Sequence, residues 1–173
     1  ADLSLVSGFL TWIIILAWLW RSGWRIQRRY FIEATQKPLT RNAIVWCAGI
    51  FGAFFFVGAQ MRPGMPAVMT VAMIGALSVY VDACTHRLPN TYTAVMGIGV
   101  LAGTLVGMLI SPMWQQRLIG CVIGMLIWTI PIAILNRLPG GMGGGDVKLA
   151  PVLGAMVGSV GLEAAVAALA LSF

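Results

Sequence analysis

Charged side chains are scarce in this sequence. Only 9% of its 173 residues are Asp, Glu, Lys or Arg, whereas 60% are hydrophobic. A soluble domain usually carries charge on about a quarter of its residues, so this chain has too few polar side chains to cover a surface in water. The composition excludes an ordinary soluble domain and predicts an integral membrane protein, most of which lies in the lipid bilayer.

Closely spaced cysteines are absent as well. Cys47, Cys84 and Cys121 form no CxxC pair, which excludes a thiolate zinc knuckle and a thioredoxin-like redox centre. His86 is the single histidine. We interpret it as a polar residue at the membrane boundary, and a catalytic base or metal ligand is the alternative. We expect neither a metal ion nor a cofactor.

Apolar runs, by contrast, fill most of the chain. The first, Leu3 to Trp20, is uncharged and would be about 27 Å long as a helix, enough to span a bilayer. Basic residues follow this run instead of preceding it, so we interpret it as a retained anchor and not as a cleaved signal peptide. Further apolar runs are Ala43–Gln60, Pro66–Val81, Thr91–Ile110 and Leu118–Leu135. We expect an all-α polytopic membrane protein with about six transmembrane helices.

The last apolar region, Val147 to Phe173, leaves two arrangements open. Val147 to Val157 would be only about 16 Å long as a helix, too short to cross a bilayer. Either one helix continues past Glu163, or a short helix turns at Gly158–Gly161 and another begins. The sequence ends at Phe173 without a polar tail, which leaves open that a further C-terminal helix is cut short there.

The uneven distribution of basic residues predicts an orientation. Basic residues of a membrane protein gather on cytoplasmic loops, and the segment 21–41 is the most basic of this chain. With this segment in the cytoplasm, the N-terminus lies outside, and Arg62 and Arg117 are the basic residues on the outer side. The cytoplasmic side then holds Arg21, Arg25, Arg28, Arg29, Lys37, Arg41, Arg87, Arg137 and Lys148. This bias explains the net charge of +6, so we expect no nucleic-acid partner.

Two of the five acidic residues stand out by position. Asp2 is terminal, Glu33 lies among basic residues and the role of Glu163 is open. Asp82 and Asp146 both fall at cytoplasmic ends of predicted helices, at one depth although 64 residues separate them. An ionisable residue at this depth indicates a functional site.

Two carboxyl groups brought together share a proton, because both cannot ionise at low cost. One of them is then a general base toward water, and its partner is a general acid toward a leaving group. These are the groups needed for peptide-bond hydrolysis without a metal ion or a covalent intermediate.

A run of glycines precedes the second aspartate in "GGMGGGDVKLAP". Glycine adopts positive φ readily and lets another backbone come close. We expect Gly143, Gly144 and Gly145 to form an irregular loop that can adopt positive φ, which allows an extended substrate peptide to lie beside Asp146.

Three other interpretations of the aspartates remain. Each could end a helix and pair with a nearby cation, Asp82 with Arg87 or His86, and Asp146 with Lys148. The chain could instead be a small ion- or proton-coupled transporter, since transporters also contain intramembrane acids and glycine-broken helices. It could also be a scaffold subunit of a secretion machine, in which the aspartates would be dispensable.

At these residues the sequence resembles the type IV prepilin peptidases, which are GxGD aspartyl proteases of the bacterial inner membrane. "DACTHRLPN", Asp82 to Asn90, is similar to the first motif of the family, an aspartate followed by a basic residue and Pro-Asn. "GGGDVKL", Gly143 to Leu149, is similar to the GxGD motif and the lysine that follows it. The resemblance extends from Pro66 to about Gly161, and before Pro66 it rests on topology.

The resemblance implies a catalytic pair, Asp82 and Asp146, and an active site that faces the cytoplasm. It implies prepilins or pseudopilins as substrates, from which a basic leader is removed in pilus or type II secretion systems. The motif positions expected to form the active-site loops are Arg87, Pro89, Asn90, Gly143, Gly144, Gly145 and Lys148.

The resemblance also suggests how the chain is organised. We expect residues 1–65 to form a two-helix region with a basic cytoplasmic loop (21–42), and residues 66–173 to form the protease domain. Many family members methylate the new N-terminus with a cytoplasmic domain that contains paired CxxC motifs. This chain has no cysteine between its first two apolar runs, so we expect peptidase activity without methyl transfer. The sequence does not specify an oligomeric state.

Overall fold

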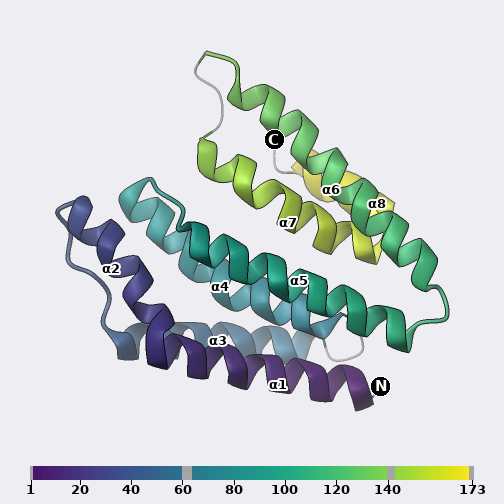
Figure 1. Cartoon of the computed structure of the whole chain (residues 1–173), viewed down its shortest axis with the longest axis horizontal. Helices are drawn as coiled ribbons and strands as arrows, with labels where there is room; N and C mark the ends of the chain where they lie inside the picture. The colour runs from purple at the N-terminus through teal and green to yellow at the C-terminus, as the bar shows by residue number, and fades with distance from the viewer. Residues whose placement is uncertain (1, 60–63, 140–142, 172–173) are drawn as a thin grey trace.

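The fold is a bundle of helices, described by a computed structural model for residues 2–59, 64–139 and 143–171 (Figure 1). The regular structure of these residues is entirely helical, which confirms the predicted all-α class. The elements are α1 (Asp2–Trp18), a π-helical turn η1 (Leu19–Gly23), α2 (Trp24–Glu33), α3 (Arg41–Gly58), α4 (Met65–Thr85), α5 (Asn90–Ile110), α6 (Trp114–Asn136), α7 (Gly144–Val160) and α8 (Leu162–Leu171).

Several of these helices are long and apolar enough to cross a membrane. Among the described residues, five segments meet that requirement: Leu3–Glu33, which contains α1, η1 and α2, and the four helices α3 to α6. Large apolar side chains point outward from them, such as Phe54, Ile98 and Leu109, as expected where lipid is the solvent. Helix α7 has 17 residues, about 26 Å of helix. The polytopic membrane protein expected from the composition is confirmed.

The structure decides between the two arrangements of the last apolar region. Helix α7 ends at Val160, Gly161 lies between the helices, and α8 begins at Leu162. The expected turn near Gly158–Gly161 is therefore correct. The expected start at Val147 is wrong, because the helix already begins at Gly144.

Helix α4 lies at the centre of the bundle and packs against α1, α3 and α5. Its side chains Met69, Met73 and Ile74 have no exposed surface, and they share one apolar core with Leu19 of η1 and Phe31 of α2. The N-terminal helices therefore pack on the same core as α4 and α5.

Helices α6 and α7 approach each other more closely than side chains would allow. Gly120 and Gly124 of α6 face Gly154 and Gly158 of α7, and a Cβ atom built on any of the four would collide with backbone of the facing helix. Such pairs of small residues four positions apart are typical of membrane helices in close contact. Helix α8 is joined to this pair by the Trp128 indole, which donates a hydrogen bond of 3.0 Å to the carbonyl of Ala165.

The helix ends bring distant parts of the sequence together. Figure 1 shows α2, the α4–α5 connection and the start of α7 at one end of the bundle, whereas the N-terminus lies at the other end. Both sequence motifs therefore lie at one end, as the alternation of loops predicts.

Candidate active site

A cavity of about 520 Å³ opens at the end of the bundle where α4 ends and α7 begins. Every site residue predicted from the sequence lines it, with one exception. The described residues around the cavity are Tyr30, Asp82, His86, Arg87, Leu88, Asn90, Gly143, Gly144, Gly145, Asp146 and Lys148. The two motifs, far apart in the chain, thus form one site.

Asp82 lies in the last turn of α4 and is half-buried. Its carbonyl accepts a hydrogen bond of 2.7 Å from the backbone N–H of His86, which ends the helix in the left-handed conformation with φ 52°. This is a common way for a helix to stop, although glycine is the usual residue there. His86 therefore redirects the chain so that Arg87, Leu88 and Asn90 face the cavity.

Asp146 lies in the first turn of α7 and is exposed to the cavity. Its backbone N–H donates a hydrogen bond of 3.1 Å to the carbonyl of Gly143. Asp146 therefore lies at the N-terminus of α7, with its side chain beside the exposed backbone of Gly143.

The glycines before Asp146 do not have the conformation expected from the sequence. Gly143 is extended, with φ −64° and ψ 150°, while Gly144 and Gly145 belong to the first turn of α7. Among the described residues, Gly64 is the one glycine in the left-handed region, with φ 87°. The expected irregular loop is wrong for Gly144 and Gly145, because they begin a regular helix, in which φ is negative.

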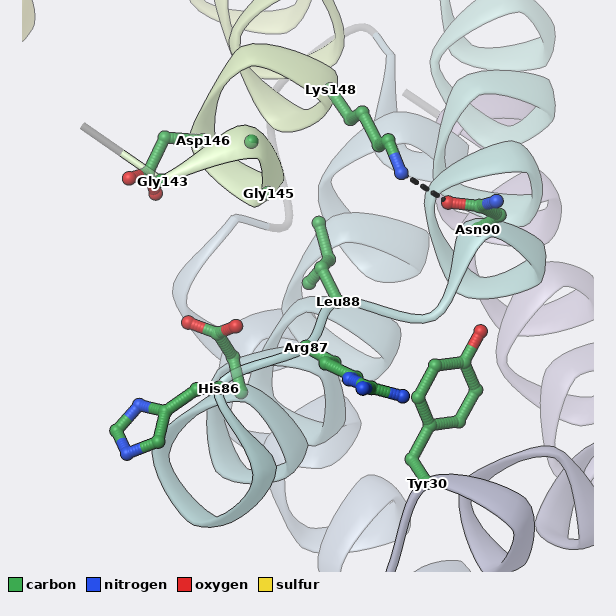
Figure 2. Close-up of a pocket in the computed structure, with 11 residues that line it drawn as sticks. Tyr30, His86, Arg87, Leu88, Asn90, Gly143, Gly145, Asp146 and Lys148 are labelled. Atoms are coloured by element: carbon green, nitrogen blue, oxygen red, sulfur yellow. Dashed lines mark hydrogen bonds between the residues drawn. The ribbon is translucent and has the colours of Figure 1, made fainter. Parts of the chain in front are cut away.

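Gly145 is needed for a different reason, the close approach of the two motifs. A Cβ atom at Gly145 would lie 3.2 Å from Cβ of Leu88 and 3.9 Å from Oδ1 of Asp82. The carboxyl group of Asp82 therefore lies against the backbone of the residue that precedes Asp146. In Figure 2, Leu88 lies between the start of α7 and Arg87.

The cations around the cavity have partners other than the aspartates. Arg87 forms an ion pair of 2.6 Å with Glu33 of α2, and Lys148 donates a hydrogen bond of 2.8 Å to Oδ1 of Asn90 (Figure 2). Among the described residues, neither Asp82 nor Asp146 has a side-chain hydrogen bond or an ion pair. The pairings with Arg87, His86 and Lys148 that would explain the aspartates as ordinary helix ends are therefore not formed.

Pro89 is the exception among the predicted site residues, since it does not line the cavity. Its side chain is fully buried, and it precedes α5 as the N-cap residue. Its carbonyl accepts hydrogen bonds from Tyr92 and Thr93. Proline has a fixed φ and cannot donate a backbone hydrogen bond, which suits the start of a helix. Pro89 therefore shapes the α4–α5 connection and does not contact the cavity.

Tyr30 and Leu88 also line the cavity, although the sequence did not single them out, and so does His86, which was interpreted as a polar residue at the membrane boundary. Leu88 lies inside the first motif, so its neighbours in the sequence were sufficient to indicate that it lies at the site. Tyr30 lies on α2, 52 positions before Asp82, and no local pattern distinguishes it. It reaches the cavity because α2 folds back on the core, where Gln27 bonds to Leu39 and the hydroxyl of Tyr92 donates to the carbonyl of Gly23.

Together these residues form an open polar cavity with two unpaired carboxyl groups on facing elements. Carboxyl groups in this arrangement can hold and polarise a water molecule, and the backbone of Gly143 and Gly144 is exposed beside them. A family model described as the type IV leader peptidase family matches residues 67–173, a segment that includes both aspartates. None of the curated proteins and none of the solved structures compared with the chain matches it.

Proposed function

Because the chain belongs to the type IV leader peptidase family, we propose that it is an aspartic endopeptidase in which Asp82 and Asp146 are the catalytic pair. One observation supports this assignment more than any other. The structure brings Oδ1 of Asp82 against Gly145, the residue before Asp146, and within the described ranges neither carboxyl group has an ion-pair partner. A pair of aspartates that only ended helices would be neutralised by Arg87 and Lys148.

We propose that the two carboxyl groups share one proton in the resting enzyme. The ionised aspartate accepts a proton from a water molecule as that water attacks the scissile carbonyl. The protonated aspartate then donates its proton to the leaving amine nitrogen.

We further propose that the substrates are prepilins or pseudopilins and that cleavage occurs at the cytoplasmic face of the bacterial inner membrane. The basic side chains support this orientation, since Arg25, Arg28 and Arg29 lie on the exposed face of α2 at the same end of the molecule as the cavity. The hydrophobic helix of such a substrate would lie in the bilayer and hold the cleavage site near the ends of α4 and α7. A transporter would need the same carboxyl groups, but membership of a peptidase family favours proteolysis.

The test is co-expression with a prepilin, followed by a gel that resolves the leader-length difference. We expect Asp82→Asn and Asp146→Asn each to abolish cleavage, since neither aspartate can replace the other. Asp2→Asn is the matched control, because Asp2 begins α1 at the opposite end of the molecule. Near-normal processing by either cavity variant, with membrane levels equal to the control, would contradict the proposed pair.

A further inference from the structure

A second cavity, of about 560 Å³, lies at the end of the bundle opposite the aspartates. It is formed where the α5–α6 connection meets the α7–α8 junction. One basic and one acidic side chain line it, Arg117 of α6 and Glu163 of α8. The proposed peptidase mechanism uses neither of them.

Arg117 is unusual because one nitrogen of its guanidinium group is buried without a partner. Its Nε atom has no hydrogen-bond partner among the residues that the structure describes. Its Nη1 atom lies close to Gly107 of α5, where a Cβ atom would be 3.9 Å away. A buried guanidinium nitrogen without a hydrogen bond is costly, so a ligand with acceptor oxygens would stabilise this arrangement.

Glu163 supplies the opposite charge in the same cavity. Its side chain is exposed, and the ion pairs of the described residues do not include it. Arg117 and Glu163 thus line one cavity without forming an ion pair of 4.0 Å or less with each other. The cavity therefore contains separate binding groups for an anion and for a cation.

The position of the cavity indicates a ligand from the membrane. The residues around it belong to helix ends, where a bilayer gives way to water, and Trp114 begins α6 beside it with 45% of its surface exposed. Tryptophan is enriched at this level of the membrane. Two helices, α6 and α8, also begin here, and their free N–H groups favour a phosphate.

We propose that this cavity binds the headgroup of a zwitterionic phospholipid with a primary ammonium group, as in phosphatidylethanolamine. Arg117 binds the phosphate with its guanidinium group, as arginine commonly does. Glu163 accepts hydrogen bonds from the ammonium group. The acyl chains extend along the exposed apolar residues near the cavity, such as Ile119 and Val160.

The experiment is native mass spectrometry of the detergent-purified chain with phosphatidylethanolamine, phosphatidylcholine or phosphatidylglycerol added at equal concentration. We expect phosphatidylethanolamine to bind best. Phosphatidylcholine has a quaternary ammonium group that cannot donate to Glu163, and phosphatidylglycerol has no ammonium group. Arg117→Gln should reduce phosphatidylethanolamine binding at least about tenfold, the scale of a lost charge-assisted hydrogen bond, whereas Arg117→Lys should reduce it less. Lys37→Gln removes an exposed charge outside the cavity and should leave binding unchanged.

Glu163→Gln provides the sharper test, because it should change the selectivity. This variant should lose its preference for phosphatidylethanolamine and bind phosphatidylglycerol equally well or better. Unchanged selectivity in Glu163→Gln, or unchanged binding in a folded Arg117→Gln, would overturn the proposal. Soluble phosphoethanolamine or inorganic phosphate that displaces the lipid at equal concentration would identify a site for a soluble anion and would also overturn it.

A direct ion pair between Arg117 and Glu163 is the competing explanation, and unfolding in lipid-free detergent tests it. If the two side chains pair with each other, single and double variants should show strong coupling in the midpoint of thermal unfolding. Such coupling without lipid would overturn the proposal. Additive effects without lipid, with coupling that emerges when phosphatidylethanolamine is added, would support it.

Discussion

A side chain at Gly145 would occupy the space between Leu88 and Asp82. The 3.2 Å separation from Cβ of Leu88 is tighter than ordinary van der Waals contact, so even a methyl group must push the α4–α5 connection away from α7. At the scale of single residues, the geometry of the site therefore depends on the absence of a Cβ atom at Gly145. In the proposed mechanism the carboxyl groups supply the chemistry, and the small size of Gly145 lets α7 lie close to Leu88 and Asp82.

We expect Gly145→Ala to reduce leader cleavage and Gly145→Val to reduce it by on the order of 10²-fold, because displacements near 1 Å can cost that much. The amount of folded protein should change little, since the site lies at the surface end of the bundle. The measurement is the initial rate of prepilin cleavage at equal enzyme concentration. Gly49→Ala is the control, as its Cβ atom would lie 3.7 Å from Leu16, an ordinary contact. Equal rates for Gly145→Val and the wild-type enzyme would show that close approach is not required.

Most of the residues that line the cavity could be predicted from the sequence, whereas their conformations could not. Asp82 and Asp146 stand out because an acidic residue in an apolar chain has few explanations, and loop alternation places both at one end. Gly145 was expected in an irregular loop that accommodates a substrate peptide, whereas it begins α7 and lies against Leu88. A glycine that avoids a collision in a helix and a glycine that adopts a left-handed turn look the same in a sequence.

Helix α7 positions Asp146. Among the described helices, the backbones of α6 and α7 approach each other most closely. The four glycines Gly120, Gly124, Gly154 and Gly158 allow the two backbones to touch. In a bilayer this contact depends on van der Waals packing, because lipid chains are as apolar as the helices themselves. At the scale of elements, α6 is therefore the support that holds the second aspartate in place.

We expect Gly124→Leu to destabilise the protein by roughly 1–3 kcal/mol or more, the usual effect of overpacking, and to reduce cleavage by moving α7. A Cβ atom at Gly124 would lie 2.7 Å from Cα of Gly158, so no side-chain movement can relieve the collision. The measurements are the thermal unfolding midpoint in detergent and the cleavage rate. Gly75→Ala should affect neither, since its Cβ atom would meet only Met96 and Val71, at 3.7 and 3.9 Å. A lowered midpoint with full activity would mean that α6 does not position Asp146.

The boundaries of α3 to α6 could be predicted from apolar runs to within a few residues, because lipid requires continuous helices. Helix α2 could not be predicted in this way. Its segment is basic and has the composition of a loop, yet one face buries Gln27 and Phe31 while arginines occupy the exposed face. That amphipathic pattern is a usable signal. The contact of α2 with the α4–α5 connection, the ion pair between Glu33 and Arg87, comes from tertiary packing.

At the scale of the whole molecule, the proposed orientation can be tested by the labelling of single cysteines. We expect Gln115→Cys, at the exposed start of α6, to react with a membrane-impermeant maleimide in spheroplasts with an intact inner membrane. Lys37→Cys, in the exposed connection before α3, should react only after the membrane is opened. The end of the molecule that carries most of the basic residues is expected to lie in the cytoplasm. Both changes are made in a chain whose native cysteines are replaced by alanine and which still cleaves prepilin. The reverse labelling pattern would place the aspartates on the outer face.

The connection between α1 and α3 also leads to a prediction about activity. It consists of η1, α2 and a short segment up to Thr40, far below the roughly 50 residues of an independent domain. We expect that the purified protein transfers no methyl group from S-adenosylmethionine to a processed pilin. The measurement is incorporation of labelled methyl, and a bifunctional prepilin peptidase serves as the positive control. Label on the pilin N-terminus above the no-enzyme level would refute this prediction.

The cavity is formed by α4 and α7, which are far apart in the sequence, and this has a consequence during synthesis of the chain. Asp82 and Asp146 are 64 residues apart, so at 5–20 residues per second the ribosome adds the second roughly 3 to 13 s after the first. During that interval the nascent chain contains α4 and α5 but no α7, so Asp82 lacks its proposed catalytic partner. Under the proposed mechanism, the chain gains peptidase activity only after α7 has been synthesised and has docked on α6.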